Sequence, residues 1–160
     1  MITPAADATF EGVVRKKSLK VLTFKKNGAV LIATNIDGYY STTPFIQWGA
    51  SFSDGTYAVQ TSSTNVSPAT AEVGKSGTAG SLTLYTNSNK VTIQSTTQST
   101  WTLEAADTPT TAYSCVNSIV KNSAGVQIGT SAGCTKFDTG GNSLGMRFTL
   151  SVAGKTLVFK

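Results

Sequence analysis

The sequence has 160 residues, of which 44 are Ser or Thr, 15 are Gly and none is His, and its formal net charge is +5. A chain without His lacks the commonest general base near neutral pH and the commonest metal ligand, which argues against an enzyme and against a metal or cofactor site. It also has no stretch of 18 apolar residues to span a membrane. Because Thr favours strands while Ser and Gly favour turns, we expect an all-β structural or binding protein.

Short alternating segments between turn residues predict strands along the whole chain, in one domain over residues 1–160. Asn27-Gly28 and Asp54-Gly55 indicate hairpins, and Asp37-Gly38 indicates a further turn. Strands are expected at residues 19–26, 29–35, 50–53, 56–60, 82–85, 91–95, 101–104, 145–152 and 155–160. The pattern favours an antiparallel β-sandwich or barrel of roughly ten short strands with few or no helices.

Three segments have individual expectations. Residues 1–17 are a candidate N-terminal arm or short helix, with the helix over Asp7–Lys17, although no segment has a sustained helical period. Residues 61–80 are small and polar and are expected to form a long exposed loop. Near the end of the chain, pairing across an Ala153-Gly154 turn puts Phe148 and Leu150 on one face, which we expect to lie in the core.

The two cysteines, Cys115 and Cys134, are equidistant from the centre of a candidate tight turn at Ser123–Val126. In a two-residue hairpin they face each other, and opposed residues have Cα atoms ~4.5–5.5 Å apart, within the reach of a disulfide. A disulfide would place the protein in an oxidising setting, exported or on a virion surface. The alternative is two buried reduced thiols that pack as small apolar side chains.

Two short motifs match catalytic or phosphate-binding patterns without their context. Residues 129–133 (GTSAG) fit the G-x-S-x-G nucleophile pattern, but that chemistry needs a His to take the serine proton. Gly74-Lys75-Ser76 resembles the end of a phosphate-binding loop, yet Ala69 stands where the pattern needs Gly. We therefore expect no catalytic residues and no phosphate loop.

Six cations lie close together in the sequence: Arg15, Lys16, Lys17, Lys20, Lys25 and Lys26. Such a cluster binds polyanions in some proteins, either a phosphate backbone or an anionic glycan. Lysines in strands also protect sheet edges from aggregation, or contact another subunit. We expect the second role, because both faces of the strand carry charge, and nucleic acid is not expected as a partner.

Four aromatic residues form a second candidate cluster: Tyr39, Tyr40, Trp48 and Tyr57. Exposed aromatic rings on β-proteins stack against sugars, which would make this a glycan-binding surface. The alternative, which we prefer, is that these rings belong to the core.

The segment Lys75–Tyr85 (KSGTAGSLTLY), followed by KVTI at residues 90–93, resembles a phrase in structural proteins of tailed phages. The resemblance covers about residues 75–95, and the Ser/Thr/Gly-rich, His-free composition is similar to that of head-decoration and tail-fibre domains. It implies a virion structural subunit that acts through contacts between subunits, and it implies no catalytic residue.

Two other functions remain open. One is an exported bacterial surface subunit, a pilin-like or adhesin domain, whose C-terminal disulfide loop the Cys115–Cys134 loop resembles. The other is a carbohydrate-binding module that uses Trp48 and the neighbouring tyrosines. We accordingly expect a homo-oligomer or larger assembly at a virion or extracellular surface, with a glycan or host surface as a further partner.

Overall fold

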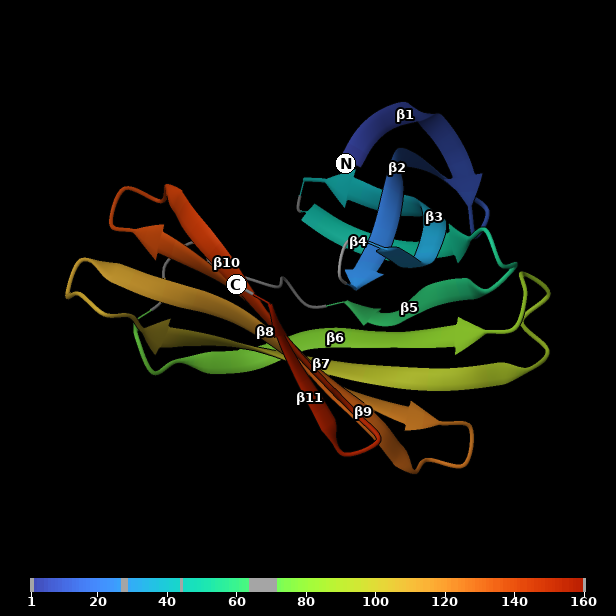
Figure 1. Ribbon diagram of the computed structural model, residues 1–160. Helices are drawn as coiled ribbons and strands as arrows, with labels where there is room; N and C mark the ends of the chain where they lie inside the picture. Colours follow the sequence, from blue (N-terminus) through green and yellow to red (C-terminus); the bar gives the residue numbers. More distant parts are fainter. Residues whose placement is uncertain (1, 27–28, 44, 64–71, 160) are drawn as a thin grey trace. The chain divides into compact units, whose positions relative to one another are not determined.

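The chain alternates between strands and short turns in the computed structural model, which describes residues 2–26, 29–43, 45–63 and 72–159 (Figure 1). At residues 2, 22, 24–26, 31–32, 63 and 159 only the backbone is described. The strands are β1 Ile2–Phe10, β2 Val13–Lys26, β3 Ala29–Thr42, β4 Phe45–Phe52, β5 Tyr57–Ser63, β6 Ser76–Tyr85, β7 Ile93–Ala105, β8 Thr111–Asn122, β9 Gln127–Asp138, β10 Ser143–Val152 and β11 Lys155–Phe159. The all-β prediction is confirmed, and none of the described segments is a helix that would cross a membrane.

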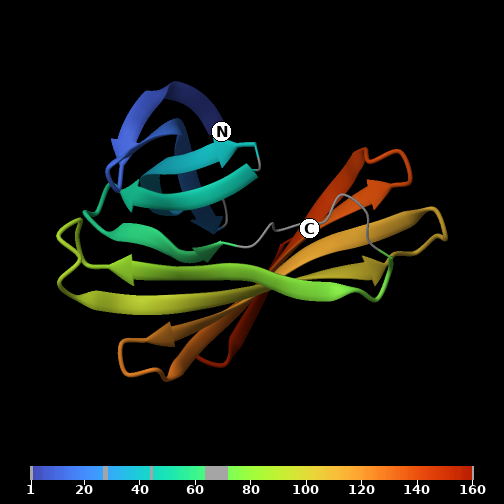
Figure 2. The same ribbon diagram turned by 180° about the vertical axis from the view of Figure 1, so that it is seen from behind.

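The strand order follows the sequence, from β1 at one end of the sheet to β11 at the other. Figure 2 shows this meander from behind. Two of these turns have positive φ at both central residues: Glu11-Gly12 (50° and 76°) and Ala153-Gly154 (50° and 74°). That is the type I′ geometry, whose twist matches the twist of the flanking strands, so short antiparallel hairpins form along the chain.

The contacts within the chain divide it into two units. Unit 1 comprises residues 1–61 and 82–94, and unit 2 comprises residues 62–81 and 95–160, so that β5, β6 and β7 each contribute to both. That the chain is one domain stays a prediction.

Two local predictions are wrong. The candidate helix over Asp7–Lys17 is instead the end of β1, the Glu11-Gly12 turn and the start of β2. The expected turn at Asp37-Gly38 lies inside β3, where Gly38 opposes Ser18 and Ala50. A glycine suits this position because an added Cβ would lie 3.1 Å from the Ser18 hydroxyl oxygen.

The loop expected over residues 61–80 is shorter than predicted. Strand β5 continues to Ser63 and β6 begins at Ser76, while residues 64–71 lie outside the described residues. The hairpin predicted at Asn27-Gly28 is confirmed by the pairing of Lys26 with Ala29, although the two turn residues themselves lie outside the described part.

The core of unit 1 is built around Phe10, whose side chain is 3% exposed. Its ring stacks on Tyr39 at a centroid distance of 4.3 Å and lies 5.3 Å from the ring of Tyr57. The ring also packs against the backbone of Gly49, where any Cβ would overlap it. Alanine residues complete this core, because Ala50 and Ala58 are both buried.

In unit 2 the cysteines are the most deeply buried side chains, and Cys115 pairs directly with Cys134 across β8 and β9. The turn that sets this register differs from the expected two-residue turn. The pairing shifts by one residue between Val120 and Lys121, and the side chain of Asn122 accepts hydrogen bonds from two backbone amides of the turn. The predicted register is therefore confirmed, but a longer turn produces it.

Candidate functional site

The four aromatic residues predicted to cluster divide into three separate environments in unit 1. Tyr39 and Tyr57 both contact Phe10 and belong to the core, as the preferred interpretation held. Tyr40 instead lies beside Phe45, with ring centroids 5.8 Å apart. Among the described residues Trp48 stacks on neither pair, and a cation covers its ring. They do not form one sugar-stacking surface.

Trp48 is held by two interactions that occupy its ring and its indole nitrogen. The indole N–H donates to the hydroxyl oxygen of Ser41 at 3.2 Å, and the guanidinium of Arg15 lies 4.1 Å from the ring centroid. A cation over an indole face is attracted by the ring quadrupole, so Arg15 competes with any sugar for this face. The role of Trp48 seen here is to hold Arg15.

Tyr57 links the core of unit 1 to a surface ion pair. Its hydroxyl donates to the Glu11 carboxylate at 2.9 Å, and Glu11 also pairs with Lys90 from the turn between β6 and β7. Burial, with the added effect of the Glu11 contact, raises the pKa of the Tyr57 hydroxyl. The hydrogen bond from Lys90, followed by that from Tyr57, lowers the pKa of the Glu11 carboxyl despite its partial burial.

We expect unit 1 to be less stable in acid, because the stabilisation from the Glu11 contacts is lost there. Because the folded pKa of Glu11 is lowered from 4.5, its contribution is present above pH 4.5 and is lost as the pH falls through the folded value. Glu11→Gln should reduce the free energy of unfolding at neutral pH by about 1 kcal/mol or less, and this difference should vanish in acid. Urea unfolding of both proteins at neutral pH and in acid measures this difference in the free energy of unfolding. Glu72→Gln is the control, because Glu72 has no recorded ion pair in the described part, and a pH-independent difference at Glu11 would contradict the assignment.

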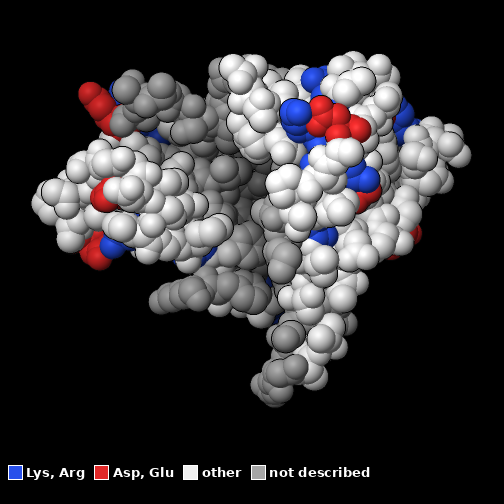
Figure 3. All heavy atoms as spheres, turned by 90° about the horizontal axis from the view of Figure 1, so that it is seen from above, with Lys and Arg blue, Asp and Glu red and all other residues white. Residues whose placement is uncertain are grey.

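The basic residues of β2 do not form one continuous cationic surface. Lys16 pairs with Asp7 at 2.9 Å and Lys17 with Asp37 at 2.8 Å, and these consecutive residues point to opposite faces of the strand. Figure 3 shows a face on which red atoms lie next to blue ones and most of the surface is uncharged. This arrangement gives no support to nucleic-acid binding.

The interpretation of these lysines as edge guards is wrong, since β2 lies between β1 and β3 and is not an edge strand. Arg15 is occupied by Trp48, and Lys20 lines a pocket. The side chains of Lys25 and Lys26 lie outside the described residues. A role of this cluster in subunit contacts stays a prediction.

The pocket that Lys20 lines has a volume of about 260 Å³. Its walls and floor come from β2, β3 and β4: Ser18, Lys20, Gly38, Tyr39, Tyr40, Phe45 and Gln47. Lys20 and Tyr40 were candidate residues from the sequence, whereas Gln47 was not. Gln47 reaches the pocket because it opposes Tyr40 in the strand register, after a shift between Tyr39 and Tyr40. No local sequence pattern marks that shift, so Gln47 could not be predicted from the sequence.

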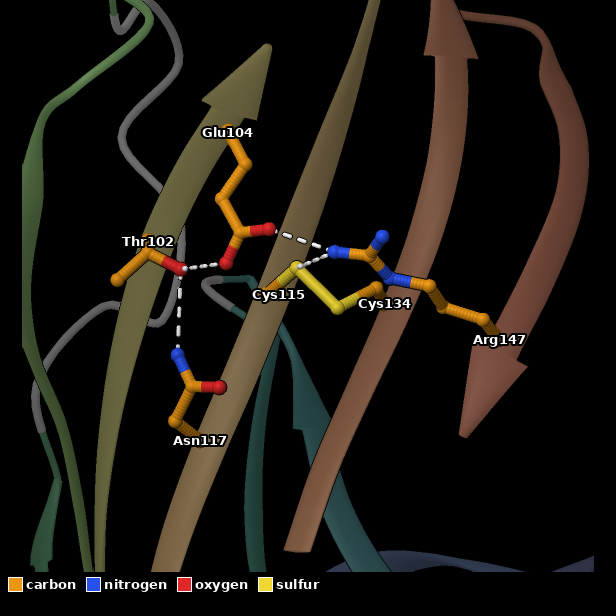
Figure 4. Close-up of a disulfide and its surroundings, with 6 residues drawn as sticks. All are labelled: Thr102, Glu104, Cys115, Asn117, Cys134 and Arg147. Atoms are coloured by element: carbon orange, nitrogen blue, oxygen red, sulfur yellow. Dashed lines mark hydrogen bonds and ion pairs between the residues drawn. A yellow bond between two sulfur atoms is a disulfide. The ribbon is translucent and has the colours of Figure 1, made fainter. Parts of the chain in front are cut away.

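The disulfide between Cys115 and Cys134 in unit 2 is confirmed, with Cα atoms 4.0 Å apart (Figure 4). The two cysteines stand in one row across four strands, because Thr102 opposes Cys115 and Arg147 opposes Cys134. Side chains of residues opposed in this way lie on the same face of the sheet. The bond therefore joins the two middle strands of this row.

A polar network surrounds the disulfide (Figure 4). The guanidinium of Arg147 donates to the Glu104 carboxylate at 2.6 Å, lies 4.0 Å from the sulfur of Cys115, and stacks 4.2 Å above the Tyr113 ring. The other oxygen of Glu104 accepts from the Thr102 hydroxyl, which in turn accepts from the Asn117 amide. Sequence analysis missed this network, since its members come from three strands and only the cysteine register aligns them.

The same network decides whether these residues make a metal site. Ligand atoms of Glu104, Cys115 and Cys134 lie within 4.8 Å of one another. While the disulfide is intact neither sulfur is a thiolate, and the thiolate is the form of cysteine that ligates metals. The remaining carboxylate is already neutralised by Arg147. These residues therefore do not fit a metal ion in the oxidised protein.

Strands β10 and β11 expose apolar side chains on one face. Met146, Leu150 and Val152 alternate along β10, and Leu157 of β11 opposes Leu150. We call these four residues the apolar face. Met146 is 70% exposed and Leu157 is 55% exposed. The prediction that this side of β10 is core is wrong at Phe148, which is 38% exposed, because alternation puts side chains on one face without determining whether that face is covered.

The two sequence motifs have ordinary structural positions. Residues 129–133 lie within β9, so the G-x-S-x-G pattern occupies an extended strand and not a strand-to-helix turn. Gly74 has φ 93° and precedes β6, so no helix follows the Gly-Lys-Ser segment. Neither motif has the local geometry that its chemistry requires.

No protein-family model matches this sequence, and no curated protein or solved structure matches it significantly.

Proposed function

We propose that the protein is a structural subunit that associates with further copies of itself through the apolar face of β10 and β11. The observation that carries the proposal is the exposure of Met146 and Leu157 together with their half-buried or exposed neighbours on the same face. Isolated exposed apolar residues are ordinary, whereas a contiguous exposed patch is typical of an interaction site. A second copy of this face would remove these side chains from water.

The two ends of the sheet differ in a way that favours association at β11. Strand β1 contains Pro4, which has no N–H to donate, and its pairing is broken between Ala5 and Ala8. Both features discourage the addition of another strand. Strand β11 is a regular strand without proline beside β10, and an edge of that kind accepts a strand from a neighbour.

The finer proposal is a virion subunit of the decoration or fibre type, at a virion or extracellular surface. The segment that carries the phage resemblance forms β6, a strand between β5 and β7. The Cys115–Cys134 disulfide suits an oxidising location. It suits an exported bacterial surface subunit equally well, and the gene neighbourhood, with head and tail genes or with secretion genes, discriminates between the two.

Substitution of the apolar face tests self-association. Leu157→Lys introduces a charge at the centre of the proposed contact, and burying an unpaired charge is costly, so we expect the assembly to dissociate to monomers. Light scattering coupled to size-exclusion chromatography measures the mass. Val91→Lys is the matched control, because Val91 is 85% exposed and belongs to unit 1, whereas the apolar face belongs to unit 2. An assembly that survives Leu157→Lys would contradict the proposal.

A further inference from the structure

The floor of the pocket in unit 1 is open because Gly38 has no side chain. Gly38 is buried in the middle of β3, and a Cβ added there would lie 3.1 Å from the hydroxyl oxygen of Ser18. The same Cβ would lie 3.8 Å from the ammonium nitrogen of Lys20. The space above Gly38 is thus bordered by a hydroxyl and a cation, both from β2.

The walls of the pocket combine aromatic rings with an amide. The rings of Tyr40 and Phe45 lie 5.8 Å apart at an interplanar angle of 40°, and Phe45 is 62% exposed. Gln47 opposes Tyr40 across β3 and β4 and lines the same space. An exposed aromatic ring provides an apolar surface for the C–H face of a sugar, and a glutamine amide supplies both a donor and acceptors for its hydroxyls.

Lys20 differs from its neighbours on β2 in having no carboxylate partner. Lys16 and Lys17 are paired with Asp7 and Asp37, whereas Lys20 has no recorded ion pair or hydrogen bond among the described side chains. No carboxylate lines the pocket. Unit 1 as a whole holds seven Lys or Arg against four Asp or Glu, so an anion entering the pocket meets an unpaired ammonium within a cationic unit.

We propose that this pocket binds a carboxylated sugar residue, a sialic or uronic acid unit of a glycan. Its carboxylate pairs with Lys20, its hydroxyls bond with Ser18 and Gln47, and its ring packs on Tyr40 and Phe45. The volume of about 260 Å³ lies just below the range of about 300–1,000 Å³ typical of drug-sized ligands, which suits one sugar unit. A phosphate dianion is a poorer match, because it is usually held by several cations or by a row of backbone amides.

Titration of the full chain with simple glycosides tests this assignment independently of self-association. The probes are the methyl glycosides of N-acetylneuraminic acid and of glucuronic acid, and neutral methyl glucoside is the comparison. Binding is measured from the shifts of the protein's amide NMR signals. We expect an acidic glycoside to shift the amides of Ser18, Gly38 and Gln47, and the neutral one to bind about tenfold more weakly, since the charge-assisted bond is lost. Binding by the sialoside or the glucuronide alone identifies the sugar class and supports the site.

Two substitutions separate the contributions of charge and shape. Lys20→Met should weaken acidic-sugar binding about tenfold and leave neutral-sugar binding unchanged, whereas Lys121→Met, at a half-buried strand lysine in unit 2, should change neither. Gly38→Ala should abolish binding of both the acidic and the neutral glycoside, because the added methyl group fills the floor of the pocket. If this variant fails to fold, Phe45→Ala replaces it, because the Phe45 ring is exposed and its loss should leave the fold intact.

Three results would overturn the proposal. They are affinities for both acidic glycosides no higher than for the glucoside, an unchanged affinity for the bound acidic glycoside in Lys20→Met, and shifts of the same amides by a glutamate-rich peptide but by neither acidic sugar. The last result would assign the pocket to an acidic protein segment.

Discussion

Replacing Phe10 by Ala is expected to lower the free energy of unfolding of unit 1 by about 3–5 kcal/mol, the usual cost of removing a buried phenylalanine ring. Phe10 is the large side chain around which Tyr39, Tyr57 and the Gly49 backbone pack. Its loss leaves a cavity that the rigid tyrosine rings are poorly able to fill. This substitution should therefore destabilise the unit more than any other described here.

Tryptophan fluorescence makes this effect specific to unit 1. Trp48 lies in unit 1 and Trp101 in unit 2, so urea unfolding in a Trp101→Phe background reports on unit 1 alone. Phe45→Ala in the same background is the matched control, since the same atoms are removed from an exposed side chain. Its cost should be within about 0.5 kcal/mol, as for ordinary surface changes. Equal losses for the two variants would show that Phe10 is not the centre of this core.

Removing the disulfide should give the second largest effect, in unit 2. The bond closes a loop with a sequence separation of 19 residues, and restricting such a loop in the unfolded chain stabilises the folded state by roughly 3 kcal/mol. We expect this loss in the Cys115→Ala/Cys134→Ala double variant. Urea unfolding of the double variant, with a thiol count on the unaltered protein, measures both the cost and the oxidation state.

Reduction provides the control for this prediction. A reductant should lower the stability of the unaltered protein toward that of the double variant and leave the double variant unchanged. Two free thiols in the unaltered protein purified without reductant would contradict the assignment of an oxidising location. Equal stability with and without reductant would contradict the role of the bond.

The sequence was most informative where pairing is local and symmetric. Cys115 and Cys134 are equidistant from a Gly-containing turn and pair as expected, because the one-residue shift between Val120 and Lys121 offsets the longer turn. Phe148 and Phe159 likewise pair across the Ala153-Gly154 turn as expected. Short hairpins leave few alternative registers, because a slip of one residue inverts both faces.

Burial could not be predicted as well as pairing. Alternation shows that the side chains of Phe148 and Leu150 share a face, but it does not show whether anything covers that face. Asp37-Gly38 has the composition of a turn, yet Gly38 serves a close approach to Ser18 inside a long strand. Both errors arise from contacts between strands, which local patterns do not contain.

The candidate site was predictable in its residue types but not in its grouping. The sequence pointed to aromatic and basic residues of unit 1, and the structure separates Tyr39, Trp48 and Tyr57 from Tyr40. Tyr39 and Tyr40 are consecutive strand residues and therefore point to opposite faces. The register shift beside them determines which β4 residue opposes Tyr40, because Gly49 opposes Tyr39 and Gln47 opposes Tyr40. Residues from both sides of that shift line the pocket with Lys20, including Gly38 before it and Gln47 opposite Tyr40 after it.

The mass of the unaltered protein in solution tests the central proposal most directly. We predict that light scattering across a wide range of concentration gives a defined multiple of the 16.6 kDa chain, with the assembly maintained at neutral pH. Association through an apolar face depends little on salt, so the mass should be the same at low and high ionic strength. A strict monomer at every concentration would contradict the proposal that this protein works by binding copies of itself.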